Sequence, residues 1–153
     1  LQLSRIHNGA YTDCEEIKVY PLLRAMQEDF EDIFSHKEIR CLVEGNTELA
    51  VKMNPTLADL LLGNLFRNAW LHTPTGGEIR VKLSEDTVVF SNTGKDALDA
   101  ERIFQRFYHS AATPQSSGLG LSICESVCRQ YGFRLDYSFG DGMHHFTCCL
   151  IQS

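Results

Sequence analysis

Residues 64–77 (NLFRNAWLHTPTGG), 103–109 (IFQRFYH) and 116–121 (SSGLGL) decide how this chain is interpreted. The first segment places Asn64 and Asn68 four residues apart in a leucine-rich helical pattern. The third segment starts a helix on glycines, which exposes backbone N–H groups to an anion. Each segment alone is a weak signal. In this order and spacing they predict a site that holds a magnesium nucleotide.

The composition fits one globular domain. The chain has 153 residues, of which 43% are hydrophobic and 22% are charged, so it can bury a single core without disulfides or a metal. Its net charge of −6 disfavours nucleic-acid binding, which needs a basic surface. No apolar run reaches the roughly 18 residues that a membrane-spanning helix needs.

The cysteines indicate free thiols. None of them forms a CxxC pair or has a histidine at the spacing of a zinc site. A chain with this many core residues does not need disulfides. We therefore expect buried free thiols at Cys14, Cys41, Cys124, Cys128, Cys148 and Cys149, the last two on opposite faces of a strand.

Hydrophobic periodicity and turn residues predict a mixture of helices and strands. Asn54 and Pro55 supply the N-cap and first turn of the helix that carries the two amides. The mixture predicts an α+β fold, a two-layer α/β sandwich with helices covering one face of a mixed sheet. Helices are expected over residues 1–7, 21–34, 55–72, 99–107 and 118–132, and strands over residues 15–20, 39–43, 49–53, 78–83, 87–91, 133–139 and 143–151.

The amide pair needs a polar partner. Asn64, Asn68 and then His72 lie on one stripe of the predicted helix. A buried amide without a partner costs about 1–3 kcal/mol. The partner is either a backbone segment that the amides pin or a bound cation, since amide oxygens are hard ligands suited to Mg²⁺.

The glycine-rich helix start predicts a phosphate cradle. Gly118 and Gly120 let an oxygen-rich ligand approach the first N–H groups of the helix, where the dipole is positive. The segment is not a P-loop, because no Lys-Ser/Thr follows, nor a Rossmann turn, because a loop precedes it. Taken alone, it could equally serve helix packing.

With these motifs, about residues 10–151 resemble the catalytic ATP-binding domain of sensor histidine kinases, within the family of gyrase, heat-shock-chaperone and mismatch-repair ATPases. NLFRNAWLHTPTGGEIRV resembles the asparagine box, IFQRFYHS the phenylalanine box and SSGLGLSICESVCRQYG the second glycine box. Residues 1–9 resemble the tail of a preceding dimerisation helix, which leaves residues 10–153 for the catalytic domain. The resemblance implies a nucleotide held between the asparagine helix and a mobile lid.

The resemblance also implies residue roles. Asn68 would ligate magnesium, with Asn64 one turn earlier beside it, and Arg106 is a further candidate catalytic residue. The adenine would lie against His72, with Asn92 and Gly94 of the first glycine box nearby. Residues 108–117 would form the lid over the nucleotide, beginning at Tyr108 and anchored by Phe104 and Phe107. The phosphates would be lined by Gly118, Leu119, Gly120 and Leu121.

Four positions depart from the family pattern. Asn92 replaces an aspartate that accepts from the adenine amino group, Asp96 replaces a glycine, and Leu71 and His109 replace basic residues. A charge-assisted hydrogen bond contributes about 1.5–3 kcal/mol, so each loss could weaken binding about 10- to 100-fold. Arg106, Arg102 or Lys95 could substitute for the missing cations. The departures leave open a degenerate, non-catalytic nucleotide-binding or interaction domain of the same fold.

Asn64 also separates reaction classes within the resemblance. Hydrolysing relatives carry a glutamate at this position to activate water, and an amide cannot accept that proton. Phosphoryl transfer to a positioned nucleophile is therefore expected. The segment FSHKEIR superficially matches a phosphoacceptor box, but its His36 ends a helix before a strand, whereas an acceptor projects from the middle of a long helix.

The sequence therefore predicts a histidine kinase domain that uses ATP and Mg²⁺. It would transfer the γ-phosphoryl group to a histidine on an upstream dimerisation domain, for relay to an aspartate of a response regulator. By resemblance, the full-length protein would be a homodimer, and this domain would be the cytoplasmic part of an inner-membrane sensor. His7, His144 and His145 have no sequence partners that suggest chemistry.

Overall fold

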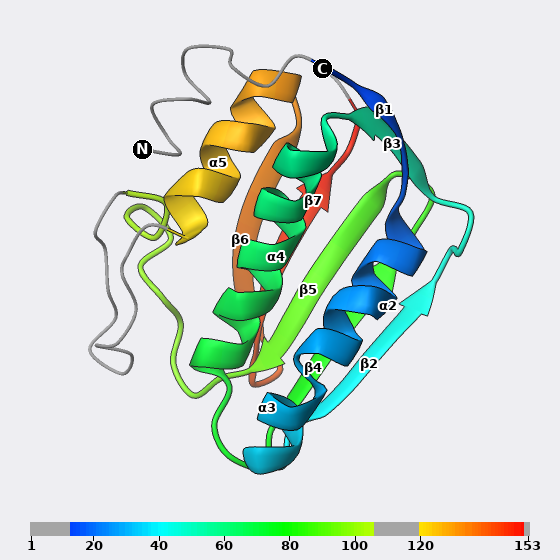
Figure 1. The fold of residues 1–153 in the computed structure, drawn as a ribbon. Helices are drawn as coiled ribbons and strands as arrows, with labels where there is room; N and C mark the ends of the chain where they lie inside the picture. The colour runs from blue at the N-terminus through cyan, green and yellow to red at the C-terminus, as the bar shows by residue number, and fades with distance from the viewer. Residues whose placement is uncertain (1–12, 106–119, 152–153) are drawn as a thin grey trace.

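The computed structural model describes residues 13–105 and 120–151 (Figure 1). Five strands form one mixed sheet in the order β2-β4-β5-β7-β6, and β1 pairs with β3 in a separate two-stranded sheet. In the larger sheet β2 and β4 run parallel, and the other neighbours run antiparallel. Helices α2, α4 and α5 lie across one face of it, which confirms the predicted α+β two-layer sandwich. In chain order the elements are β1 (Glu15–Lys18), α2 (Val19–Asp29), α3 (Glu31–His36), β2 (Arg40–Gly45), β3 (Ala50–Met53), α4 (Pro55–His72), β4 (Glu78–Leu83), β5 (Thr87–Thr93), α5 (Gly120–Tyr131), β6 (Arg134–Gly140) and β7 (Met143–Cys149).

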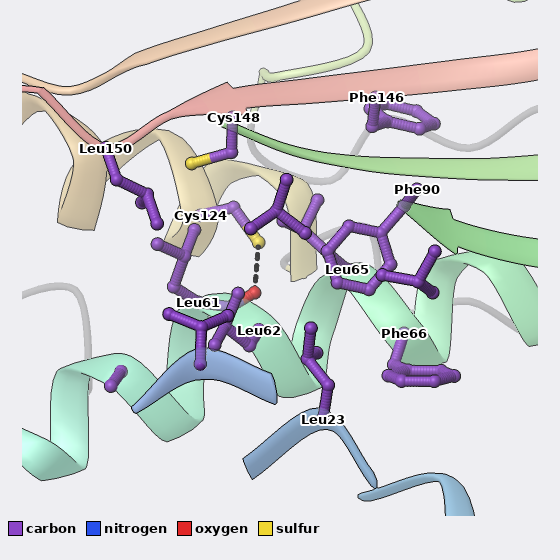
Figure 2. Packing of buried hydrophobic residues seen from close by; sticks show 14 of the residues in the cluster. Leu23, Leu61, Leu62, Leu65, Phe66, Phe90, Cys124, Phe146, Cys148 and Leu150 are labelled. Atoms are coloured by element: carbon purple, nitrogen blue, oxygen red, sulfur yellow. Dashed lines mark hydrogen bonds between the residues drawn. The ribbon is translucent and has the colours of Figure 1, made fainter. Parts of the chain in front are cut away.

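Helix α4 is the central element of the helical layer. The Asn54 side chain caps it by accepting from the backbone N–H groups of Thr56 and Leu57 at 2.9 and 3.2 Å, and Pro55 opens its first turn. Its residues Leu61, Leu62 and Leu65 lie in the buried core (Figure 2). The buried residues of α4 are Leu57, Ala58, Leu61, Leu62, Leu65, Phe66 and Ala69.

The inner face of the sheet follows the alternation of the strands. Residues that pair across β4, β5 and β7 form rows, and the buried members of these rows face the helices. Two of the rows are apolar. The third row contains Ile79 on β4, Asn92 on β5 and His144 on β7, so two polar side chains lie inside the core where these strands end.

Two predictions for the N-terminal half were wrong in detail. The strand predicted over residues 15–20 ends at Lys18, and α2 begins at Val19, before Pro21. The single helix predicted over residues 21–34 is divided at Phe30 into α2 and α3. The division brings the ring centroids of Phe30 and Phe34 to 6.0 and 6.1 Å from that of Phe66. Aromatic packing on Phe66 therefore explains the break between the two helices.

The strands on either side of Gly45 belong to different sheets, because β2 joins the larger sheet and β3 pairs with β1. Gly45 has a φ of 120°, and a Cβ on it would lie 2.0 Å from the backbone oxygen of Leu83, so glycine is required there. The helix predicted over residues 99–107 is a series of turns as far as Gln105, where the first described range ends. The prediction for residues 1–7 lies outside the described residues.

All six cysteines are thiols and none of them forms a disulfide. The prediction that the thiols are buried is confirmed for Cys124, Cys128 and Cys148 and is wrong for Cys14, which is exposed. The Cys124 thiol donates to the backbone oxygen of Leu61 at 3.4 Å (Figure 2), and the sulfurs of Cys128 and Cys148 lie 3.8 Å apart. These contacts join α5 to α4 and to β7. Within residues 13–105 and 120–151, no three His, Cys, Asp or Glu side chains gather as a metal site, and no helix has the length and apolar character to cross a membrane.

Candidate functional site

The amide stripe of α4 has one tethered member and one member without a partner. The Asn64 side-chain N–H donates to the backbone oxygen of Leu60 at 2.7 Å, which leaves its Oδ1 as the available atom. The Asn68 side chain forms no hydrogen bond with any residue that the structure describes. Both side chains are partly buried. The amides therefore present oxygen atoms that are available to a ligand, and Asn68 does not pin a described backbone segment.

The start of α5 lies against this stripe. A Cβ on Gly120 would be 3.2 Å from Asn64 Oδ1, tighter than an ordinary van der Waals contact. The glycine thus lets the first turn of α5 approach the Asn64 amide closely. Leu121 follows on the same helix and packs partly buried against the core.

Asn92 provides a buried acceptor that has no partner. Its side chain is fully buried on β5, and its N–H donates to the backbone oxygen of Thr93 at 3.3 Å. Its Oδ1 has no hydrogen-bond partner among the residues that the structure describes. Leaving such an atom unpaired costs about 1–3 kcal/mol, so a missing ligand donor is the simplest explanation.

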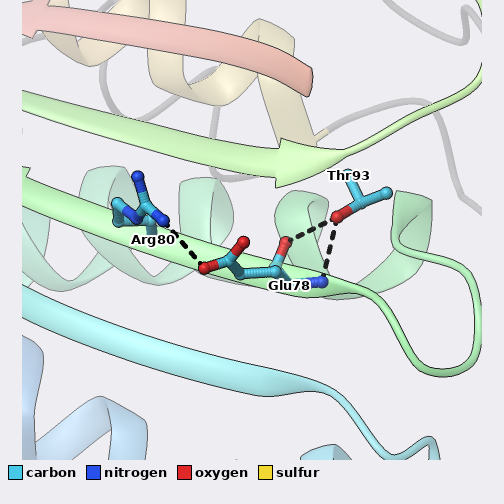
Figure 3. A network of polar contacts seen from close by, with 3 residues as sticks. All are labelled: Glu78, Arg80 and Thr93. Carbon is cyan, nitrogen blue, oxygen red and sulfur yellow. Dashed lines mark hydrogen bonds and ion pairs between the residues drawn. The ribbon is translucent and has the colours of Figure 1, made fainter. Parts of the chain in front are cut away.

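The Thr93 hydroxyl fixes the end of β5 beside Asn92. It accepts from the backbone N–H of Glu78 at 3.0 Å and lies 3.4 Å from the Glu78 oxygen (Figure 3). On β4, the Arg80 guanidinium forms an ion pair with the Glu78 carboxylate at 2.9 Å (Figure 3). The peptide oxygen that orients the Asn92 amide is therefore held by the neighbouring strand.

His72 lies at the last residue of α4, on the same stripe as Asn64 and Asn68. Its ring centroid is 6.5 Å from that of His144, in an edge-to-face arrangement. Burial, followed by the effects of His144 and Lys37, lowers the pKa of His72 to about 4. The ring is therefore neutral at pH 7 and can lie against an uncharged base.

His144 is a site residue that the sequence interpretation missed. It is only 4% exposed and faces Asn92 across the β5–β7 pair. A Cβ on Gly94 would collide with its ring, because that Cβ would lie 2.2 Å from His144 Nε2. The signal was available, since His144 alternates with Phe146 and Cys148, the buried residues of β7. His145 points to the opposite face of the sheet, where its Nδ1 is 2.7 Å from the Ser91 hydroxyl oxygen.

The structure thus places the predicted residues in two groups along α4. Asn64 and Gly120 meet near its middle, and His72 and Asn92 lie close to His144 and Gly94 at its end. Asn68 lies on the stripe between them. The predictions for Arg106, Tyr108, Gly118 and Leu119, and those for Phe107, His109 and the lid, fall outside the described residues.

The arrangement suits an adenine nucleotide. The unpaired Asn92 oxygen can accept from an exocyclic amino group, whereas its N–H group is already engaged by Thr93. The amide oxygens of Asn64 and Asn68 are the hard ligands that Mg²⁺ prefers, and the start of α5 favours negative charge. The donor set therefore fits a magnesium-bound phosphate chain at one end of the stripe and a purine with an amino group at the other.

Comparisons with known proteins give one consistent result. A family model described as "Histidine kinase-, DNA gyrase B-, and HSP90-like ATPase" matches residues 53–151. The heme sensor protein HssS of Staphylococcus saprophyticus is 31% identical over 135 residues, which cover 83% of this chain and 29% of HssS. The chain thus spans less than a third of that relative.

Solved structures show the same fold. The catalytic domain of histidine kinase ThkA matches with a TM-score of 0.83 and 24% identity, covering 92% of this chain and 97% of that domain. Histidine kinase ThkA in complex with the response regulator protein TrrA matches with a TM-score of 0.77 and 22% identity, covering 99% of this chain and 46% of the other.

Proposed function

Because the chain belongs to the histidine kinase-, DNA gyrase B- and HSP90-like ATPase family, we propose that it is the ATP-binding kinase domain of a two-component sensor histidine kinase. In this proposal the domain binds ATP and Mg²⁺ and transfers the γ-phosphoryl group to a histidine on an upstream dimerisation domain. The phosphoryl group then passes to an aspartate of a response regulator.

The buried, unpaired oxygen of Asn92 carries this proposal. A purely structural domain has no reason to keep an unsatisfied acceptor in its core, where an apolar residue of the same size would be more stable. The amino group of adenine would satisfy that oxygen, while the neutral ring of His72 would lie against the base. Asn92 would therefore accept a hydrogen bond from the adenine amino group in place of the family aspartate, without that residue's charge.

Asn64, Asn68 and the first turn of α5 would hold the phosphates. The available Oδ1 of Asn64 faces Gly120, and Asn68 has no partner among the described residues, so both amide oxygens are available to a cation. Mg²⁺, when bound, would neutralise the charge of the phosphates. Arg106, Tyr108, Gly118, Leu119 and Leu121 complete the proposed nucleotide site.

Asn64 favours transfer over hydrolysis. Its side-chain N–H is already held by Leu60, and its neutral oxygen cannot take a proton from water. In phosphoryl transfer the protein mainly orients the reactants and neutralises charge, so no general base is required at this position. We therefore assign Asn64 to positioning the phosphates.

The partners follow from the same proposal. The acceptor histidine would belong to a dimerisation domain whose tail is residues 1–9, and the full-length protein would be a homodimer with this domain in the cytoplasm beneath a membrane sensor. The relative HssS is named a sensor protein, and ThkA has been solved with a response regulator, which supports a response regulator as the downstream partner.

Calorimetry with ATP and Mg²⁺ tests the proposal directly. The wild-type chain should bind both ATP and ADP, and Asn68→Ala should weaken binding at least about tenfold, because it removes a cation ligand. Arg67→Ala is the matched control, since Arg67 is the exposed preceding residue on the same helix. The full-length protein should form an acid-labile phosphohistidine that Asn68→Ala abolishes.

Three outcomes would contradict the proposal or a part of it. If the wild-type chain released no heat with ATP and Mg²⁺, the departures at Leu71 and Asn92 would instead indicate a non-catalytic interaction domain of the same fold. If the chain released phosphate steadily without an acceptor, it would be an ATP-hydrolysing relative. If Asn68→Ala kept wild-type affinity and transfer, the magnesium role of Asn68 would be wrong.

A further inference from the structure

Tyr137 and His144 form a polar contact beneath the loop that follows Asn92. The Tyr137 hydroxyl on β6 lies 2.8 Å from Nδ1 of His144 on β7, and the two ring centroids are 5.8 Å apart. The same hydroxyl accepts from the backbone N–H of Leu98 at 2.8 Å. One phenol group therefore joins two strands of the sheet to the loop.

The protonation of His144 suits this contact. Burial, followed by the charge of His145, lowers the pKa of His144, so the ring is neutral at pH 7. A neutral ring with its proton on Nε2 can accept the Tyr137 hydroxyl hydrogen at Nδ1, while the phenol oxygen accepts from Leu98. Each donor then has an acceptor.

The loop is held at both of its ends by this pair of strands. At its start, Gly94 packs on the His144 ring so closely that no Cβ would fit, and its N–H donates to the Gly142 oxygen at 2.9 Å. At its end, the Leu98 N–H is bound by Tyr137. The loop begins two residues after Asn92, so its position bears on the orientation of that amide.

We propose that Tyr137 and His144 are positioning residues that hold residues 94–98 in place, so that Asn92 Oδ1 faces the amino group of the bound base. The inference rests on the proposed nucleotide-binding function. Neither residue is assigned a contact with the nucleotide. Their effect is to keep the Asn92 amide in the orientation that selects adenine, whose amino group donates, over hypoxanthine, which has a carbonyl at that position.

Two tyrosines provide a matched test. Tyr137→Phe removes the hydroxyl that binds Leu98, and Tyr131→Phe removes one that accepts from the backbone N–H of Asn54 at 2.9 Å, at the opposite end of α4. Both rings pack on an aromatic neighbour, with centroid distances of 5.0 Å to Phe146 and 5.3 Å to Phe133. The variants therefore lose the same kind of bond, and only one of them lies under the loop.

The measurements are ADP affinity, the ratio of ATP to ITP affinity and the amide hydrogen exchange of Leu98 without nucleotide. We expect Tyr137→Phe to weaken ADP binding about five- to tenfold, to reduce the preference for ATP over ITP and to speed exchange at Leu98. Tyr131→Phe should lower the melting temperature without changing the affinity or the preference. His144→Asn, which keeps an acceptor near the place of Nδ1, should retain more of the preference than His144→Ala.

The inference would be overturned if Tyr137→Phe kept the wild-type affinity and preference, or if both tyrosine variants weakened binding equally. Unchanged exchange at Leu98 in Tyr137→Phe would also overturn it. Failure of the proposed function has a different signature, because the wild-type protein itself would then bind no nucleotide, while the exchange experiment would still report whether Tyr137 holds the loop.

Discussion

Asn64 Oδ1 and Gly120 are in such close contact that a Cβ on the glycine would lie 3.2 Å from the amide oxygen. The other end of the amide is tethered, because its N–H donates to the Leu60 oxygen at 2.7 Å. The oxygen is therefore directed toward the first turn of α5 by its own helix. The two motifs of the proposed phosphate site, separated by more than fifty residues, meet at this pair.

Gly120→Ala should weaken nucleotide binding with little loss of stability. The added methyl would press against the Asn64 amide oxygen and would fill the space beside the helix start. We expect ADP affinity measured by calorimetry to fall about tenfold, or about 1.4 kcal/mol. The melting temperature should change little.

Gly63→Ala is the control for this substitution. Gly63 precedes Asn64 on α4, and the nearest atom to its added Cβ is Met26 Cε at 3.9 Å, an ordinary contact. Alanine should stabilise the helix by up to about 1 kcal/mol and leave nucleotide affinity unchanged. Equal affinity losses in the two variants would contradict the role assigned to the Asn64–Gly120 contact.

Asn92→Leu should separate stability from binding. Leucine has the same branched skeleton of four side-chain heavy atoms and removes the unpaired buried oxygen, so the free energy of unfolding in urea should stay equal or rise by about 1 kcal/mol. ATP binding should be lost to calorimetry, because the acceptor for the amino group is gone. Ser91→Ala, which removes the bond to His145 at 2.7 Å on the opposite face, should lower stability by about 1 kcal/mol and leave ATP binding intact.

A less stable Asn92→Leu variant would indicate that the Asn92 amide is structural, since the bond from its N–H to Thr93 would then outweigh the unpaired oxygen. Retained ATP affinity in that variant would exclude Asn92 as the adenine acceptor. Either result would remove the observation on which the proposed function depends.

The fold was predictable where the local signals were complete. Asn54 and Pro55 define the start of α4, and its leucine pattern defines its buried face, so the prediction matched the helix over residues 55–72. The hairpin of β4 and β5 was equally predictable from its alternation around Glu85-Asp86. These elements carry most of the described site residues.

The remaining features depend on contacts that sequence spacing does not contain. The break at Phe30 exists because two rings converge on Phe66, and β2 and β3 enter different sheets because they pair with β4 and β1. The Asn64 and Asn92 positions came from motifs, but His144 joins the site only because β7 lies beside β5. The alternation of β7 was a signal that His144 is buried, which the sequence analysis did not use, and only the sheet order shows what it contacts.

Thiol reactivity should follow burial. Cys124, Cys128 and Cys148 are within the core, and burial raises the pKa of Cys124. The pKa of Cys148 is raised as well, by its bond to Cys128 and then by burial. Since the thiolate is the reactive form, these residues should resist a disulfide reagent such as DTNB in the folded protein, whereas exposed Cys14 should react quickly.

The rate at which Cys41 reacts should depend on pH. Burial raises its pKa to about 12, so its reaction at pH 8 should be slow and should accelerate as the pH rises toward that value. In urea all six thiols should react at similar rates. Rapid labelling of Cys124 or Cys148 in the folded protein would show that α5 separates from the sheet more readily than its packing indicates.

Acidification should destabilise the fold through His72. Its pKa is lowered from 6.5 to about 4, so below pH 6.5 the unfolded chain binds a proton that the folded chain does not. Stability is therefore complete above about pH 6.5 and falls as the pH drops toward 4, with a loss from this residue of at most about 2 kcal/mol at pH 5. Burial lowers the pKa of His144 too, so that residue contributes in the same direction.

His72→Phe, which keeps an aromatic ring that cannot be protonated, should flatten the dependence of the urea-derived free energy of unfolding on pH between pH 7 and 5. His36→Gln provides the exposed-histidine control. A His72→Phe profile as steep as the wild-type profile would mean that His72 is accessible to protons in the folded state, and the neutral ring proposed to lie against the base would be wrong.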